Sequence, residues 1–143
     1  DKIDDIMEQV KCPVAVFVNR GYREGALVSF VLGGMIDIFL LSYISIMLQN
    51  GHSVRLFLFD TDDEEFCRCM NDLQARYSGQ ITIVRFAGVE ELVTREKDGL
   101  LVMSHLSYTK LSEDELVMRE LSSLLVIRRN KNKGEKNERL EIG

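Results

Sequence analysis

The stretch that decides the fold is residues 26–60, ALVSFVLGGMIDIFLLSYISIMLQNGHSVRLFLFD. Residues 26–32 are almost all apolar, which is typical of a strand buried on both faces of a sheet. After Gly33-Gly34, residues 35–49 place apolar side chains at helical spacing, and residues 53–59 are again strand-like. The stretch therefore predicts one strand–helix–strand unit of a parallel sheet.

The rest of the chain repeats this alternation. We expect strands at residues 14–18, 26–32, 53–59, 80–86, 100–104 and 124–128. We expect helices at residues 1–10, 35–49, 60–77, 89–97 and 112–121. Ser112 and Glu115 have the spacing of a capping box at the start of the last helix, and residues 105–111 are expected to be a loop.

The fold class that follows is α/β, a three-layer sandwich around a five-stranded parallel sheet with an extra N-terminal edge strand. Because crossovers are right-handed, we expect the strands from residue 26 onward in the order 3-2-1-4-5, with ligand-accessible loops at their carboxyl ends. The strand at residues 14–18 should pair beside the fifth strand, in its own chain or in a partner, since an unpaired apolar edge invites aggregation.

Composition limits the class of protein. The 143 residues suit one domain with short extensions, and 45% hydrophobic with 29% charged residues suffices for an ordinary core. A net charge of −5 predicts an acidic surface that repels phosphate backbones, so we expect no nucleic-acid partner. The cysteines, Cys12, Cys67 and Cys69, lack the spacing of a disulfide framework, which favours a reducing cytoplasm.

A transmembrane helix is the alternative interpretation of residues 26–48, which are nearly all apolar. Asp37 opposes it, because a charge at the centre of a membrane span is costly, and Gly33-Gly34 interrupt the helical pattern. The helix at residues 35–49 is nevertheless apolar around most of its circumference. We therefore expect another domain or a partner chain to cover its far side.

The chain is expected to contain three segments. Residues 10–20 and 121–130 share the order helix end, small polar residue, apolar strand and Arg/Asn, with chance as the alternative explanation. We therefore interpret residues 1–21 as the last helix and strand of a preceding similar domain. Residues 22–130 form the α/β domain, and the polar residues 131–143 are expected to be a disordered tail.

The candidate ligand pocket lies where the first and fourth parallel strands part. The glycine pair is neither a dinucleotide fingerprint nor a P-loop, so a tight turn is the simpler interpretation. Asp37 suits either the helix dipole or a ribose or amine ligand. Neither histidine has metal-ligand spacing, and no nucleophile–base set is visible, so we expect no metal and no catalysis. The expected rim residues are Gly33, Gly34, Asp37, Asp60, Ser104 and His105.

Three short motifs carry a family resemblance: KCPVAVFVNRG at residues 11–21, FVLGGMID at residues 30–37 and VRF at residues 84–86. Together they resemble the universal stress protein fold, and more narrowly the soluble C-terminal region of monovalent cation/proton antiporters. In that family two universal-stress-like halves follow the membrane domain. The first half closes on a segment like the first motif, and the second opens on one like the second.

The resemblance implies a non-catalytic regulatory or dimerisation domain on the cytoplasmic side of an inner or plasma membrane sodium or potassium/proton antiporter. Its partners would be the transmembrane part of the parent chain and a sister half or second copy. ATP-binding universal stress proteins carry a Gly-rich loop after the fourth strand, but residues 102–112 contain no glycine. No cofactor is therefore expected beyond a small ligand or a nucleotide, and a stand-alone nucleotide-binding protein is the alternative. The expected edge or dimer residues are Val14, Val16, Val18, Leu125 and Ile127.

Overall fold

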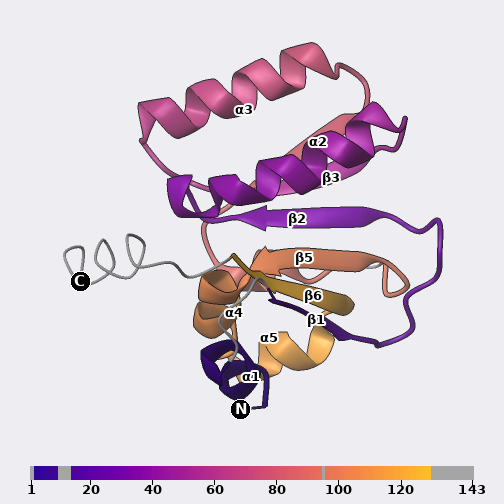
Figure 1. Ribbon diagram of the computed structural model, residues 1–143, viewed down its shortest axis with the longest axis vertical. Helices are drawn as coiled ribbons and strands as arrows, with labels where there is room; N and C mark the ends of the chain where they lie inside the picture. The colour runs from indigo at the N-terminus through magenta and orange to yellow at the C-terminus, as the bar shows by residue number, and fades with distance from the viewer. Residues whose placement is uncertain (1, 10–13, 95, 130–143) are drawn as a thin grey trace.

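A computed structural model describes residues 2–9, 14–94 and 96–129, and it is an α/β sandwich of three layers (Figure 1). A six-stranded, mostly parallel sheet forms the middle layer, in the order β1-β6-β5-β2-β3-β4. The strands are β1 Val14–Val18, β2 Val28–Leu32, β3 Val54–Phe59, β4 Ile81–Phe86, β5 Leu100–Ser104 and β6 Ser123–Arg128.

The strand order follows from two kinds of pairing. The five strands from β2 onward pair in parallel and lie as β4-β3-β2-β5-β6, which is the order expected for them along the chain. The sixth strand, β1, pairs with β6 of its own chain and runs antiparallel to it, with Val16 opposite Val126. The whole sheet is therefore six-stranded and mixed rather than five-stranded and parallel.

The helices cover both faces of this sheet. Figure 1 places α2 and α3 on one face, and α1, α4 and α5 on the other. Residues 35–49, expected as one helix, begin with a 3-10 turn, η1, and continue as α2. The helical segments are α1 Lys2–Gln9, η1 Met35–Leu40, α2 Leu41–Gln49, α3 Glu64–Arg76, η2 Val89–Leu92, α4 His105–Leu111 and α5 Glu115–Glu120.

Three local expectations were wrong. Residues 105–111 are the helix α4 and not a loop, because Ser104 Oγ accepts a hydrogen bond from the Ser107 N–H at 3.1 Å and so caps the helix. Ser112 does not form a capping box, since α5 begins after Asp114, whose carboxylate accepts from the Val117 N–H at 3.0 Å. The helix expected at residues 89–97 is the short turn η2, which ends at Leu92.

Alternation along the strands divides the core into two clusters. Phe30 and Leu32 of β2 pack toward α2 and α3, whereas Val31 between them packs with the cluster under α4 and α5. Both clusters are almost free of solvent contact, as expected for strands covered on both faces. This double burial explains why the β2 segment is apolar without alternation.

The outer face of residues 35–49 carries exposed apolar side chains. Ile36, Tyr43 and Ile46 are 55%, 42% and 57% exposed, so the described part of the chain does not cover this face. None of the helices that the structure describes is both long and apolar enough to cross a membrane. Cys12, the whole tail at residues 131–143, and residues 10–13 and 130 of the suggested repeat lie outside the described residues.

Candidate functional site

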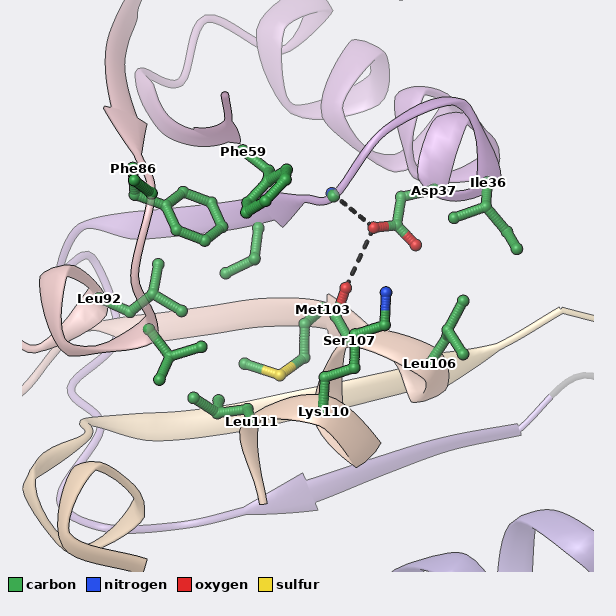
Figure 2. A pocket seen from close by; sticks show the side chains of 14 residues that line it. Ile36, Asp37, Phe59, Phe86, Leu92, Met103, Leu106, Ser107, Lys110 and Leu111 are labelled. Carbon is green, nitrogen blue, oxygen red and sulfur yellow. Dashed lines mark hydrogen bonds between the residues drawn. The ribbon is translucent and has the colours of Figure 1, made fainter. Parts of the chain in front are cut away.

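A pocket of about 190 Å³ opens at the carboxyl ends of the central strands (Figure 2). It lies at the switch point, where chain connections leave β2 toward β3 on one side and β5 toward β6 on the other. Fourteen residues from β2, β3, β4, β5, η1, η2 and α4 and the adjoining turns line it, most of them apolar. They are Val31, Gly33, Ile36, Asp37, Phe59, Phe86, Ala87, Val89, Leu92, Met103, Leu106, Ser107, Lys110 and Leu111.

Asp37 is the most unusual group in this pocket, because its side chain is almost fully buried at 1% exposure. One carboxylate oxygen, Oδ2, accepts hydrogen bonds from the Gly33 N–H at 2.7 Å and from the Ser107 hydroxyl at 3.1 Å (Figure 2). The other oxygen, Oδ1, is buried and has no hydrogen-bond partner among the described residues. Asp37 therefore ties the β2 turn to α4 and leaves one acceptor unpaired.

The hydrogen bond of the Gly33 N–H bears on whether this turn can bind the phosphate of a nucleotide. In phosphate-binding folds the N–H groups of the turn after the first strand point at the phosphate. Here the Gly33 N–H already donates to a carboxylate, which would repel a phosphate placed in the same turn. Gly34 adopts φ of +145°, so the turn requires glycine for its backbone conformation. The glycine pair thus makes a tight turn in which the Gly33 N–H is already bonded to a carboxylate.

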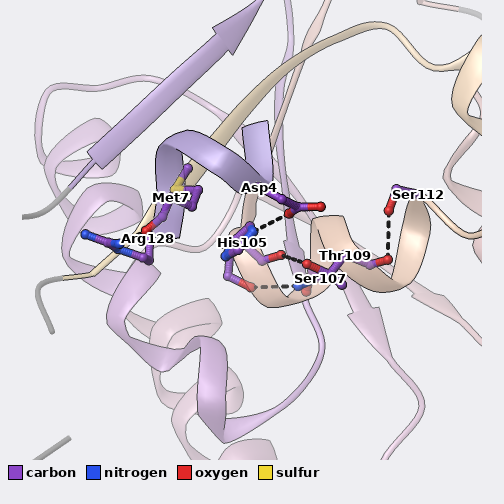
Figure 3. A network of polar contacts seen from close by, with 8 residues as sticks. Asp4, Met7, His105, Ser107, Thr109, Ser112 and Arg128 are labelled. Atoms are coloured by element: carbon purple, nitrogen blue, oxygen red, sulfur yellow. Dashed lines mark hydrogen bonds and ion pairs between the residues drawn. The ribbon is translucent and has the colours of Figure 1, made fainter. Parts of the chain in front are cut away.

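The remaining rim residues expected from sequence do not line the pocket. Ser104 is buried and caps α4, and the Asp60 N–H donates to the Phe86 carbonyl oxygen at 3.0 Å. His105 faces α1, with its Nε2 atom 2.5 Å from Asp4 Oδ1 (Figure 3). That contact fixes α4 against α1, and so His105 has a structural partner remote from the pocket.

Several residues that line the pocket were not predicted from the sequence. Ser107 and Lys110 lie on α4, in the segment expected to be a loop. Phe59 and Phe86 end neighbouring strands and form an edge-to-face pair with ring centroids 5.6 Å apart. The one available signal was Ser104, three residues before Ser107, because serine at that position is a common helix cap.

The expected edge residues lie at one border of the sheet. Val14, Val16 and Val18 belong to β1 and pack against the core cluster that includes Val126, and Leu125 and Ile127 belong to β6. Because β1 already pairs with β6, the open border of the sheet on this side is β1. Phe17 on β1 is 49% exposed there.

One wall of the pocket is a turn held by Glu91. Its Oε2 atom accepts from the Ala87 and Gly88 N–H groups at 2.7 and 2.8 Å, which positions Val89 and Leu92 of η2. The hydrogen bonds from Gly88 and then Ala87 lower the pKa of the Glu91 carboxyl below its usual value of 4.5.

The lowered pKa of Glu91 predicts that the free energy of unfolding depends on pH. A carboxyl whose pKa is lowered on folding stabilises the protein above its unfolded-state pKa, and this contribution is lost as the pH falls through the folded-state value. We expect Glu91→Gln to lower the free energy of unfolding at pH 7, with the difference from wild type shrinking below about pH 4.5. Urea unfolding at pH 7 and pH 3 measures it, and the adjacent Glu90→Gln is the matched control. An equal difference at both pH values would contradict the assignment.

Comparison with known proteins adds no family to this description. No protein-family model, no curated protein and no solved structure that was compared with the chain matches it.

Proposed function

We propose that this chain is a non-catalytic, universal-stress-like regulatory domain of a sodium or potassium/proton antiporter, which binds a small ligand in the strand-end pocket. The observation that carries the ligand-binding part is the pocket itself, at the place where open α/β sheets bind ligands. The motifs at residues 11–21, 30–37 and 84–86 support the universal-stress-like and antiporter parts. A cytoplasmic position and a homodimer or sister-half partner belong to the same proposal.

The chemistry of the pocket favours regulation over catalysis or nucleotide binding. The Asp37 carboxylate occupies the turn where a phosphate would bind, which disfavours the alternative of a stand-alone nucleotide-binding protein. His105, the one histidine near this end of the sheet, is engaged with Asp4. A ligand held here would act by favouring one of two states of the parent protein.

The exposed apolar face of residues 35–49 supports contact with another part of the parent. Ile36 belongs to both that face and the pocket lining, so the two features meet at η1. A ligand that displaces Ile36 would therefore change the surface that faces a partner. This continuity gives the regulatory proposal a route from pocket to surface.

The test is cation/proton exchange by the longer chain that contains this domain, reconstituted in vesicles. We expect Ala87→Phe, which places a ring into the pocket, to change the pH dependence or rate of exchange several-fold. The matched control is Ala75→Phe on the exposed face of α3, which should leave exchange unchanged. Equal exchange in both variants and wild type would contradict the regulatory proposal, as would a coding sequence upstream of Asp1 without apolar helices.

Calorimetry addresses the alternative function. Titration of ATP into the 143-residue chain should give no binding at micromolar concentrations, because the carboxylate of Asp37 repels phosphate in the β2 turn. Micromolar affinity would instead support the nucleotide-binding protein. Sedimentation of the same sample tests the dimer, which a stable monomer at high concentration would contradict.

A further inference from the structure

We propose that the strand-end pocket takes an uncharged, single-ring aromatic molecule whose polar head both donates and accepts a hydrogen bond. A primary carboxamide is the simplest head of this kind. The inference rests on the proposed function in one respect, since it names the ligand class of the same pocket. Four observations carry it: the volume, the aromatic wall, the unpaired oxygen of Asp37 and the position of Lys110.

The volume sets the size of the ligand. An apolar cavity of about 150 Å³ is known to hold benzene. The pocket measures about 190 Å³, so it has room inside for one ring and a head of a few atoms. The ligand is therefore about one ring in size.

The walls favour an aromatic body. Phe59 and Phe86 form an edge-to-face pair at the mouth, and Figure 2 shows Met103 and Leu111 at the opposite wall, below them in this view. Phe59 is 40% exposed, so it has ring surface left to contact a ligand. An added ring can continue the edge-to-face arrangement, and the Met103 sulfur favours aromatic neighbours.

The unpaired oxygen of Asp37, Oδ1, lacks a hydrogen-bond donor among the described residues. A buried polar atom without a hydrogen bond lowers stability, and the loss is larger when the atom belongs to a charged group. Asp37 Oδ1 is in this condition, while Oδ2 is satisfied by Gly33 and Ser107. In Figure 2, Oδ1 points away from Phe59 and Phe86, toward the part of the wall that Leu106 forms. Oδ1 has almost no accessible surface, so a ligand reaches it by displacing a neighbouring side chain of that wall, and its donor then completes the site.

Lys110 is the reason that the polar head of the ligand must also accept a hydrogen bond. Figure 2 shows its ammonium directed toward the Asp37 carboxylate, yet no ion pair within 4.0 Å joins the two described residues. A head placed between them meets a negative acceptor on one side and a positive donor on the other. A cationic amine would be repelled by the positive charge of Lys110. A carboxylate would be repelled by the negative charge of Asp37. A carboxamide donates through N–H to Asp37 and accepts through its carbonyl from Lys110.

The test uses three probes of matched shape and different charge: benzamide, benzylamine and benzoate. Each is titrated into the 143-residue chain and followed by two-dimensional NMR of the backbone amides. We expect benzamide to bind with a dissociation constant on the order of 1 mM, and to shift the Gly33 and Ser107 amides. Benzylamine and benzoate should bind at least about 10-fold more weakly.

Two variants test the polar contacts. Asp37→Asn keeps an oxygen for Gly33 and Ser107 but places an amide donor where Oδ1 was. We expect it to weaken benzamide about 10-fold and to strengthen benzoate, which reverses the order of the two probes. Asp60→Asn is the matched control and should change neither, because Asp60 does not line the pocket. Lys110→Met changes an exposed side chain, and it should weaken the binding of benzamide and strengthen that of benzylamine.

The outcomes separate this inference from the proposed function. Tighter binding of benzylamine or benzoate than of benzamide to the wild type would overturn the head chemistry, while still showing that the pocket holds a small ligand. Unchanged benzamide affinity in both Asp37→Asn and Lys110→Met would overturn the assigned contacts. Binding of none of the probes would overturn the inference, whereas the exchange assay with Ala87→Phe decides the regulatory role independently.

Discussion

Replacing Phe30 with alanine is expected to lower the free energy of unfolding by about 3–5 kcal/mol, a large part of the stability of a domain of this size. Phe30 lies on β2, the strand that pairs with both β3 and β5 at the centre of the sheet, and only 2% of its surface is exposed. It packs in the cluster beneath α2 and α3, which includes Leu56 and Val102 on the neighbouring strands. Both strands hold backbone positions there, so the structure cannot collapse into the cavity.

Phe17→Ala is the matched control for this prediction. The ring of Phe17 lies on the edge strand β1, is 49% exposed, and makes one edge contact with Tyr22. The same chemical change there should cost about 1 kcal/mol or less. Urea denaturation followed by circular dichroism measures both. Equal losses in the two variants would mean that β2 is not the central strand.

The strands could be predicted from sequence because each is a short, largely apolar run. Burial on both faces removes alternation from β2 and β3, and such runs end clearly at glycine or charged residues. The order of the parallel strands then followed from the right-handed rule for crossovers. The direction of β1 could not be predicted, because nothing in residues 14–18 distinguishes antiparallel from parallel pairing.

Only some of the residues that line the pocket could be predicted from the sequence. Gly33 and Asp37 follow β2 directly, and the end of the first strand of such a sheet always reaches the switch point. Ser107 and Lys110 depend on α4, a segment expected to be a loop, while Ser112 was expected to begin the following helix. Ser104 caps a helix because its hydroxyl reaches the Ser107 N–H, which is a matter of backbone geometry that Ser112 does not share.

The interpretation of His105 failed for a different reason. A histidine at the end of a strand is a reasonable candidate for a site, but its partner Asp4 is about a hundred residues away along the chain. Such a long-range contact leaves no trace in local spacing. The buried state of Asp37 was equally invisible, since its hydrogen-bond partners come from a turn and from a helix of another unit.

The second large effect is expected at Gly99, which lies in the turn before β5 and is buried. A Cβ atom there would stand 2.8 Å from the Leu27 carbonyl oxygen and 3.4 Å from that of Glu96. The Leu27 oxygen cannot move away freely, because it accepts a hydrogen bond from the Leu100 N–H at 3.0 Å where β2 and β5 begin to pair. We expect Gly99→Ala to lower the free energy of unfolding by about 2–4 kcal/mol, through overpacking and a weakened hydrogen bond.

Gly88→Ala separates rigid from flexible obstruction. Its added Cβ would lie even closer to a neighbour, 2.3 Å from an Oε atom of Glu90, but that atom ends an exposed and flexible side chain. The Glu90 side chain can rotate into solvent, so the loss should be about 1 kcal/mol or less. Urea unfolding of the two variants ranks them, and a larger loss for Gly88→Ala would contradict the argument. If Gly99→Ala causes the larger loss of stability, a fixed backbone oxygen is a greater obstacle than a closer carboxylate that can move. The start of β5 is then held rigidly against β2.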